Sequence, residues 1–294
     1  MTIQSSLSEI RGLINDEIDA ALPVPETKEA RLVEAMRYSS IGTGKVLRPF
    51  LAMTVGKMLG LEQKTAVRIG LAIEMLHTYS LIHDDLPAMD NDPIRRGKPS
   101  NHIQFDEATA ILAGDALQTK AFEVLLDPKT HDDPAVRARL AMALAKAAGA
   151  EGMAGGQMMD LIGEKDPLNL DEVERMQSLK TGALLNFSCV APALAIDANP
   201  NIIEALTKYA KALGLMFQIT DDILDVEGNA ETVGKTLRKD SEAHKSTFVS
   251  ILGLQKAKEL AKNLLIQGKD ALAIFGDKAK DLSDILDFIL ERKK

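Results

Sequence analysis

Residues 63–90 read QKTAVRIGLAIEMLHTYSLIHDDLPAMD, a long apolar run that leads into three aspartates. Its apolar residues recur at spacings of three and four, which predicts one helix over Gln63 to Asp85. A second run, residues 202–226, reads IIEALTKYAKALGLMFQITDDILDV and also leads into three aspartates. The same spacing recurs through most of the chain, without alternating β-branched runs bounded by hairpin turns. The sequence therefore predicts an all-α fold.

The composition is that of a folded globular protein. The chain has 294 residues, of which 46% are hydrophobic and 27% are charged, enough to bury a substantial core. No stretch has the composition of a linker, so we expect a single domain over residues 1–294. The one cysteine, Cys189, cannot form an internal disulfide, which fits a reducing compartment.

Charge and hydropathy argue against two kinds of partner. The formal net charge is -8 and aromatic residues make up 4%, so neither a basic stripe nor a base-stacking platform is visible. No run approaches the roughly 18 apolar residues of a membrane span, and residues 1–20 lack the apolar core of a signal peptide. We therefore expect no nucleic acid partner, no membrane span and a cytoplasmic location.

Local sequence marks several helix starts. A capping side chain precedes proline at Asp133-Pro134 and at Asn199-Pro200, the arrangement that suits the first helical position. Asn169 and Glu172 resemble a capping box. We expect helices to begin at these three places.

The two aspartate clusters predict a metal site. Two unit charges about 4 Å apart repel by roughly 4 kcal/mol at an effective dielectric constant near 20, so carboxylates gathered in one cavity need bound cations to stay ionised. Sparse carboxylates suit magnesium with a diphosphate, whereas calcium prefers a fuller protein cage and a loop register that neither cluster has. Solvated helix ends are the alternative for either cluster alone, but two clusters on two long apolar helices favour a site. The candidate ligands are Asp84, Asp85, Asp90, Asp221, Asp222 and Asp225.

Helix geometry suggests how each cluster is arranged. Asp221 and Asp225 are one turn apart and share a face with Gln218. In the first cluster Pro87 cannot sit comfortably inside a helix, so the chain should loosen there and let Asp90 fold back towards Asp84.

Basic residues near the clusters indicate an anionic ligand. Arg95 and Arg96 follow the first cluster, Lys45 and Arg48 lie upstream, and Lys235 follows the second cluster. An enzyme with two diphosphate substrates could bind one through magnesium and the other through Lys45, Arg48 and Arg96. Each of these residues alone is more typical of a solvated surface.

Two further features could have a role in binding phosphate, but each is explained as well by an ordinary structural role. Gly234-Lys235-Thr236 lacks both the first glycine and the preceding strand of a P-loop, so an ATPase is disfavoured. His77 lies two turns before Asp84 and could donate to a phosphate, but a lone histidine in an apolar helix is more often a core residue.

These motifs resemble the signature set of the trans-prenyl diphosphate synthases, over roughly Met36 to His244. The stretch from Asp84 to Asp90, followed by Arg95-Arg96-Gly97, is similar to the first aspartate-rich motif of that family. Its other landmarks resemble three segments: Gly155 to Leu161, Lys180-Thr181-Gly182 and Phe217 to Asp225.

The resemblance implies an isoprenoid synthase fold, with about ten core helices around a deep cavity, and a homodimer. It implies a short-chain trans-prenyltransferase that condenses isopentenyl diphosphate with dimethylallyl or geranyl diphosphate. The steps would be magnesium-assisted ionisation, condensation and proton elimination, with three magnesium ions held by the two aspartate motifs.

The resemblance also assigns a role to each matching residue. The six aspartates named above would hold metal directly or through water. The residues that would grip the allylic diphosphate are Arg95, Lys180 and Lys235. Those that would hold isopentenyl diphosphate are Gly44, Lys45, Arg48, His77 and Arg96. The reacting carbons would be lined by Thr181 and Gln218.

Two departures from the family pattern are visible. Val46 replaces an arginine in the segment Gly42 to Pro49, so local contacts of the isopentenyl site are expected to differ. The loop after Lys235 lacks the common second glycine, so closure of a lid would also differ.

Product length should depend on Tyr79, five residues before Asp84 and roughly 7.5 Å away along the helix, with Ser80 beside it. In related bacterial enzymes an aromatic residue here goes with a fifteen-carbon product, and methionine or a smaller residue with twenty carbons. The resemblance thus favours farnesyl diphosphate, with geranylgeranyl diphosphate as the alternative. The alternative that Tyr79 serves only to pack the helix, and does not limit product length, stays open.

Two other classes of protein remain as rivals. A class I terpene cyclase would share the fold and the first motif, but its second motif normally carries Asn, Ser or Thr and Glu ligands. A non-catalytic subunit of a heteromeric synthase would usually lose one aspartate cluster, and here both are whole.

Overall fold

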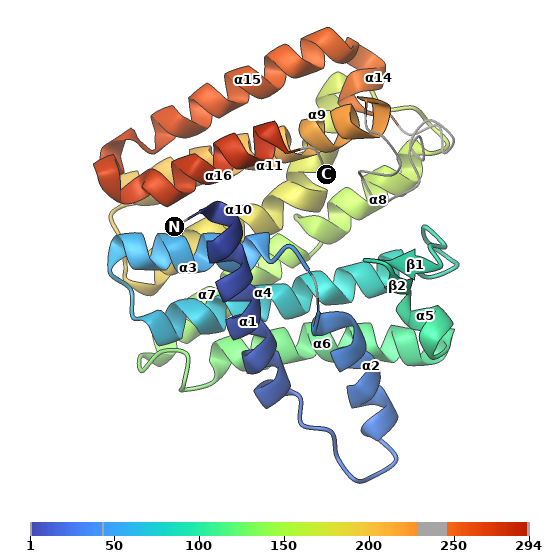
Figure 1. Cartoon of the computed structure of the whole chain (residues 1–294). Helices are drawn as coiled ribbons and strands as arrows, with labels where there is room; N and C mark the ends of the chain where they lie inside the picture. Colours follow the sequence, from blue (N-terminus) through green and yellow to red (C-terminus); the bar gives the residue numbers. More distant parts are fainter. Residues whose placement is uncertain (1, 43, 228–245, 293–294) are drawn as a thin grey trace. The chain divides into compact units, whose positions relative to one another are not determined.

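The computed structural model describes residues 2–42, 44–227 and 246–292 (Figure 1). The chain divides into two compact units, Met1–Met142 and Ala143–Lys294. The first aspartate motif belongs to the first unit and the second motif to the second.

The first unit is built from helices and one short hairpin. Its elements, in order, are α1 (Ile3–Ala21), α2 (Ala30–Ser40), α3 (Leu47–Leu59), α4 (Gln63–Asp84), β1 (Ile94–Arg95), β2 (Lys98–Pro99), α5 (Asn101–Gln104) and α6 (Glu107–Leu126). Helix α7 (Pro134–Ala148) runs from this unit into the next.

Helix α4 is the centre of the first unit. It is buried over most of its length, with Ile73, Met75 and Leu76 fully enclosed, and it packs mainly against α6 and α3 (Figure 1). A helix that is apolar nearly all round is stable only when neighbours cover it. This enclosure fixes the end of α4, where the first aspartate motif begins.

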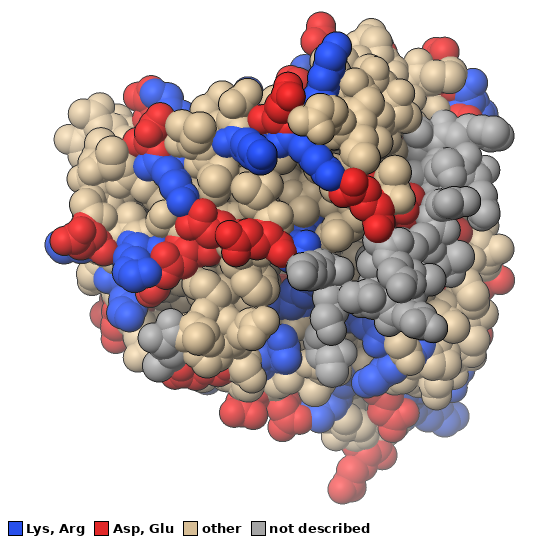
Figure 2. Space-filling view, turned by 45° about the horizontal axis from the view of Figure 1, so that its top comes forward, with Lys and Arg blue, Asp and Glu red and all other residues tan. Residues whose placement is uncertain are grey.

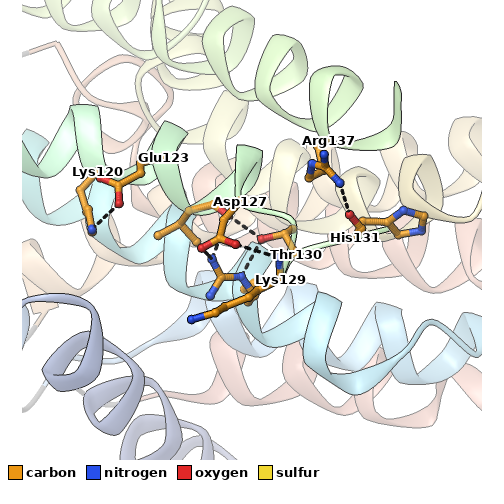
Figure 3. Close-up of polar contacts among 9 residues, drawn as sticks. Lys120, Glu123, Asp127, Lys129, Thr130, His131 and Arg137 are labelled. Carbon is orange, nitrogen blue, oxygen red and sulfur yellow. Dashed lines mark hydrogen bonds and ion pairs between the residues drawn. The ribbon is translucent and has the colours of Figure 1, made fainter. Parts of the chain in front are cut away.

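The connection from α6 to α7 ties down the opposite end of α4. Thr130 is fully buried, and its carbonyl oxygen accepts from the Thr65 hydroxyl at 2.7 Å. Arg68 donates to the Thr130 hydroxyl at 2.6 Å and pairs with Asp127 at 3.1 Å. Figure 3 shows Asp127 and Thr130 turned towards each other, while Arg137 donates to the His131 carbonyl oxygen nearby. The start of α4 is therefore held by hydrogen bonds as well as by packing.

The second unit is helical throughout its described part. Its elements are α8 (Met153–Gly163), α9 (Leu170–Gln177), the π-helix η1 (Ser178–Gly182), α10 (Ala183–Ala195), α11 (Pro200–Glu227), α14 (Phe248–Leu252), α15 (Leu254–Ala271), the 3₁₀ helix η2 (Ala273–Ala279) and α16 (Lys280–Glu291).

Helix α11 plays the central part in the second unit. It packs against α15, α10 and α16. The fully buried Tyr209 donates its hydroxyl to the carbonyl oxygen of Leu282 in α16 at 2.9 Å. A buried tyrosine hydroxyl needs such a partner, so this bond fixes α16 on α11.

The predicted fold class is confirmed. Apart from β1 and β2, the described ranges contain no strand. Helices begin at Pro134 and Pro200, and the capping box of Asn169 and Glu172 is present, with bonds of 3.1 and 2.9 Å. No helix among the described residues combines the length and apolarity needed to cross a membrane.

On the face drawn in Figure 2, acidic and basic side chains are interspersed.

Candidate active site

The first aspartate motif forms as expected where α4 ends. The helix stops at Asp84, and the backbone N–H of Asp90 donates to the Asp84 carbonyl oxygen at 2.9 Å. Pro87 lies in the turn between them, where its missing N–H costs nothing. The chain therefore folds back and brings Asp90 to the end of the helix.

The side chain of Asp85 is buried in an ion pair with Arg95 rather than exposed to solvent. Its side chain is 3% exposed, and Arg95 binds both carboxylate oxygens, with Nε at 2.9 Å from Oδ1 and 3.1 Å from Oδ2. Burial raises the pKa of Asp85, and the contact with Arg95 opposes that shift. The two residues predicted to hold metal and the allylic diphosphate thus bind each other in this structure.

Arg96 is presented by a tight hairpin. β1 and β2 pair Arg95 with Lys98, which leaves Arg96 and Gly97 as a two-residue turn. Both have positive φ, +53° and +76°, the conformation of a type I′ turn. A Cβ on Gly44 would lie 2.8 Å from Arg96 Nη1. Glycine at position 44 therefore lets the guanidinium approach the backbone.

Arg48, His77 and Arg96 form a basic cluster around one buried acid, Glu74. Glu74 is 3% exposed, and its Oε1 lies 4.0 Å from Arg96 Nη2. Burial raises the pKa of Glu74, while Arg96 and Arg48 lower it. One carboxylate facing two guanidinium groups leaves a net positive charge, which favours an anionic ligand.

Burial changes the titration of this cluster. Burial is the main cause that lowers the pKa of Arg48 to about 10, with Arg96 adding to it and Glu74 opposing. Burial and the nearby arginines, Arg48 first, bring the pKa of His77 well below its usual value. His77 is therefore neutral at pH 7, with one ring N–H to donate. Among the described residues, buried Arg48 Nε has no hydrogen-bond partner.

Lys45 and Val46 precede α3. Lys45 is exposed. Val46, the departure from the family pattern, caps α3 with φ of +44°, a conformation that is costly for a β-branched residue.

The second aspartate motif occupies the last turns of α11. Asp221 and Asp225 are one turn apart, as expected. Asp222 is 8% exposed, and its Oδ2 accepts from the backbone N–H of Phe248 at 2.8 Å. Asp221 accepts from Arg292 Nη2 at 2.7 Å. Asp221 and Asp222 are thus held by contacts within the second unit.

The π-helix η1 carries Lys180 and Thr181. Lys180 Nζ lies 2.7 Å from Asp160 Oδ2, and Gln218 Nε2 donates to Thr181 Oγ1 at 3.3 Å. A Cβ on Gly156 would meet the Lys180 backbone at 2.1 Å, so α8 approaches η1 closely. Short π-helical turns are frequent at functional sites.

Tyr79 lies against its own helix neighbour. Its ring is 5.3 Å from the His83 ring at an interplanar angle of 88°, and His83 Nε2 lies 3.0 Å from the Ile111 carbonyl oxygen of α6. Ser80 donates its hydroxyl to the His77 carbonyl oxygen at 2.8 Å. Tyr79 is thus turned towards the α6 side of α4.

The donor chemistry of both motifs fits a divalent cation that keeps several waters. Within the described ranges, no three acidic, histidine or cysteine side chains converge as a ready metal cage. Magnesium does not need one, because it takes one or two carboxylates together with water and substrate phosphate oxygens. The carboxylates therefore fit magnesium better than a metal held by protein alone.

Lys235, which the sequence predicts to bind the allylic diphosphate, lies outside the described residues. Three residues that contact predicted site residues were not predicted from the sequence. The missed residues are Glu74, Asp160 and Arg292. Glu74 had a usable signal, since it is an acid inside an apolar helix three residues before His77. Asp160 and Arg292 are paired through folding with residues 20 and 71 positions away, which spacing alone does not reveal.

Comparisons with known proteins give one consistent result. The polyprenyl synthetase family model matches residues 29–280. The chain is 44% identical to farnesyl diphosphate synthase of Micrococcus luteus, covering 99% of this chain and 100% of that protein. It is 42% identical to the large subunit 1 of a chloroplastic heterodimeric geranylgeranyl pyrophosphate synthase of Arabidopsis thaliana, covering 96% of this chain and 77% of that protein.

The solved structures agree. An apo structure of an FPP/GFPP synthase from Zymomonas mobilis is similar with a TM-score of 0.90 and 43% identity, covering 98% of each chain. With a family model that spans most of the chain and relatives that match it nearly from end to end, this protein belongs to the polyprenyl synthetase family.

Proposed function

We propose that the protein is a short-chain trans-prenyltransferase that condenses isopentenyl diphosphate with dimethylallyl or geranyl diphosphate to give farnesyl diphosphate. One observation carries the proposal: α4 has carboxylates at its end and, two turns earlier, His77 within the basic cluster of Arg48 and Arg96. One helix thus serves two ways of binding a diphosphate, through metal and through cations. The farnesyl diphosphate synthase relatives support the product.

The basic cluster would hold isopentenyl diphosphate. Arg48 and Arg96 supply planar guanidinium groups that match phosphate oxygens, and neutral His77 adds one N–H donor. Lys45 is exposed and would bind the same anion, with Gly44 leaving room for Arg96. The negative charge of Glu74, 4.0 Å from Arg96 Nη2, would limit the repulsion between the two arginines.

The allylic diphosphate would be held by Arg95, Lys180 and Lys235, with magnesium on the two aspartate motifs. The family uses divalent metal ions, and we propose three magnesium ions per active site. When bound, they would neutralise charge on the departing diphosphate. The proposal requires Asp84, Asp85 and Asp90 to act on the same substrate as Asp221, Asp222 and Asp225.

The chemistry follows from these roles. The carbon–oxygen bond of the allylic substrate breaks, and the departing diphosphate keeps the electron pair while cationic side chains stabilise its charge. The double bond of isopentenyl diphosphate then forms the new carbon–carbon bond, and the product loses a proton that the freed diphosphate can accept. Thr181 and Gln218 bind each other beside this chemistry and would exclude water from the allylic cation.

We further propose a homodimer formed by one polyprenyl synthase domain per chain, located in the cytoplasm. The dimer is supported by α6, which leaves Ile111, Leu112 and Leu126 between 43% and 56% exposed. At 3.6 residues per turn these side chains fall within an arc of about 100°. Exposed apolar patches mark interaction surfaces.

An assay of diphosphate release separates the proposed reaction from the cyclase alternative. Purified protein with magnesium should release diphosphate only when both geranyl diphosphate and isopentenyl diphosphate are present, and chelation should stop the release. Release from an allylic diphosphate alone would indicate a cyclase. No release with any pair of substrates would indicate a non-catalytic subunit.

A further inference from the structure

The C-terminal end of the described chain brings an arginine onto the second aspartate motif. Arg292 follows the last residue of α16, and its Nη2 donates to Asp221 Oδ1 at 2.7 Å and to the Phe217 carbonyl oxygen at 2.9 Å. Its guanidinium carbon also lies 4.1 Å from the centroid of the Phe217 ring. Three contacts thus hold the guanidinium over one turn of α11.

In the ion pair between Arg292 and Asp221, the arginine side chain is buried and the aspartate side chain is partly exposed. The side chain of Arg292 is 6% exposed, and that of Asp221 is 45% exposed. Burial lowers the pKa of Arg292, and Asp221 opposes that shift. A buried guanidinium needs a fixed anionic partner, whereas exposed pairs hold each other only loosely. The enclosed partner therefore sets the position of the exposed one.

Helix α16 is itself fixed on α11, so Arg292 approaches from a rigid element. The hydroxyl of Tyr209 bonds the Leu282 carbonyl oxygen at 2.9 Å. A Cβ on Gly268 of α15 would lie 2.9 Å from Leu286 Cδ1, which shows how closely α15 and α16 pack. The packing of α16 on α11 and α15 thus determines where Arg292 contacts Asp221.

We propose that Arg292 is a positioning residue for the second aspartate motif: it fixes the Asp221 carboxylate through Oδ1 and presents Oδ2 to a divalent cation. The inference rests on the proposed function, because that function makes Asp221 a metal ligand. Hydrogen-bond partners of metal-binding groups orient them, and their loss typically costs about 10- to 100-fold in metal affinity or activity. A guanidinium near a cation also repels it, so the sign of the effect reveals which influence is larger.

Manganese binding to the full-length protein without substrate provides a test other than activity. Electron paramagnetic resonance of free Mn²⁺ gives the affinity of the wild type, Arg292→Ala, Arg292→Lys and Asp221→Asn. We expect Arg292→Ala to bind Mn²⁺ at least about 10-fold more weakly. Arg292→Lys should also bind weakly, since an ammonium keeps the charge but cannot reproduce the planar guanidinium's contacts with Phe217 and Asp221.

The matched control is Lys269→Ala. It removes an ion pair between α15 and α16, Lys269 with Asp287 at 2.7 Å, without touching the aspartate motif, and should leave Mn²⁺ affinity unchanged. Circular dichroism would establish that each variant is folded. In the elongation reaction, Arg292→Ala should need about 10-fold more magnesium for half-maximal rate and recover most of kcat at saturation.

Three results would overturn the proposal. Unchanged Mn²⁺ affinity in Arg292→Ala would mean that Asp221 needs no help from Arg292, and tighter binding would mean that the arginine competes with the metal. If Asp221→Asn binds Mn²⁺ like the wild type, Asp221 is not a ligand and the positioning role falls with it. Loss of the proposed function is recognised separately, as absence of condensation by the wild type.

Discussion

Tyr79 of α4 is the residue that we propose limits the length of the product. Its ring packs edge-on against His83, and burial, with Asp84 and Asp115 adding to it, raises the pKa of its hydroxyl. His83 in turn lies close against α6, because a Cβ on Gly114 would lie 2.1 Å from His83 Nε2. Tyr79 therefore has little freedom to turn aside for a growing chain.

Replacing Tyr79 should lengthen the product. Tyr79→Met removes a rigid ring and leaves a flexible side chain, so we expect the main product to shift from fifteen to twenty carbons. Tyr79→Phe is the matched control, because it keeps the ring and should keep the fifteen-carbon product. Chromatography of the dephosphorylated alcohols measures both. A fifteen-carbon product from Tyr79→Met would assign Tyr79 to packing alone.

His77 should make the fold sensitive to acid. Its pKa in the folded chain lies well below the value of about 6.5 expected in the unfolded chain. As the pH falls below about 6.5, the unfolded chain takes up a proton that the folded chain does not, and stability falls by up to about 1.4 kcal/mol per pH unit. Above that pH the histidine contributes no pH dependence.

Urea denaturation at pH 7, 6 and 5 tests this with His77→Gln. The free energy of unfolding of the wild type should decline towards pH 5 by up to about 2 kcal/mol more than that of the variant. Parallel pH profiles would show that His77 titrates in the folded chain as it does in the unfolded one.

Among the secondary-structure elements, the approach of α8 to η1 depends on a missing side chain. A Cβ on Gly156 would lie 2.1 Å from the Lys180 backbone nitrogen, and backbone cannot move aside as a side chain can. We expect Gly156→Ala to lower the free energy of unfolding by about 1–3 kcal/mol and to displace Lys180, reducing kcat.

Gly12→Ala is the matched control for that substitution. Gly12 lies inside α1, and a Cβ there would have no atom of the described residues within 4 Å. Alanine is favoured over glycine in helices by about 0.5–1 kcal/mol, so Gly12→Ala should stabilise the chain. Thermal or urea denaturation compares the two variants, and a stable, fully active Gly156→Ala would contradict the close approach.

Much of the element structure could be predicted from local sequence. Capping residues and apolar spacing located the starts of α7, α9 and α11, and Pro87 accounted for the turn after α4. These features are local, so neighbouring residues determine them. The π-helical form of η1 was not predicted, because its backbone depends on packing against α8 and α11.

The partners of the motif residues were harder to predict than the motifs. Asp85 with Arg95 joins residues close in sequence, but Asp221 with Arg292 spans 71 positions and depends on how α16 packs on α11. The sequence identified the carboxylates because each cluster comes at the end of a long apolar helix. It gave no information on side chains that reach them from another helix.

For the whole molecule, the exposed face of α6 predicts self-association. Leu112 is 56% exposed, and Leu112→Glu would place a charge in an apolar contact. We expect light scattering after size-exclusion chromatography to give a dimer for the wild type and a monomer for Leu112→Glu. Ile266→Glu on α15, where the isoleucine is 57% exposed, is the control and should remain dimeric. A monomeric wild type would contradict the proposal.

The most direct test of the proposed function is the chain length made by the wild-type protein. Purified protein would be incubated with magnesium, isopentenyl diphosphate and either dimethylallyl or geranyl diphosphate, and the dephosphorylated products separated by chromatography. We predict a dominant fifteen-carbon alcohol from either starter, absent when the metal is chelated. A dominant product of twenty or more carbons would contradict the farnesyl assignment, and the absence of any elongated product would contradict the prenyltransferase itself.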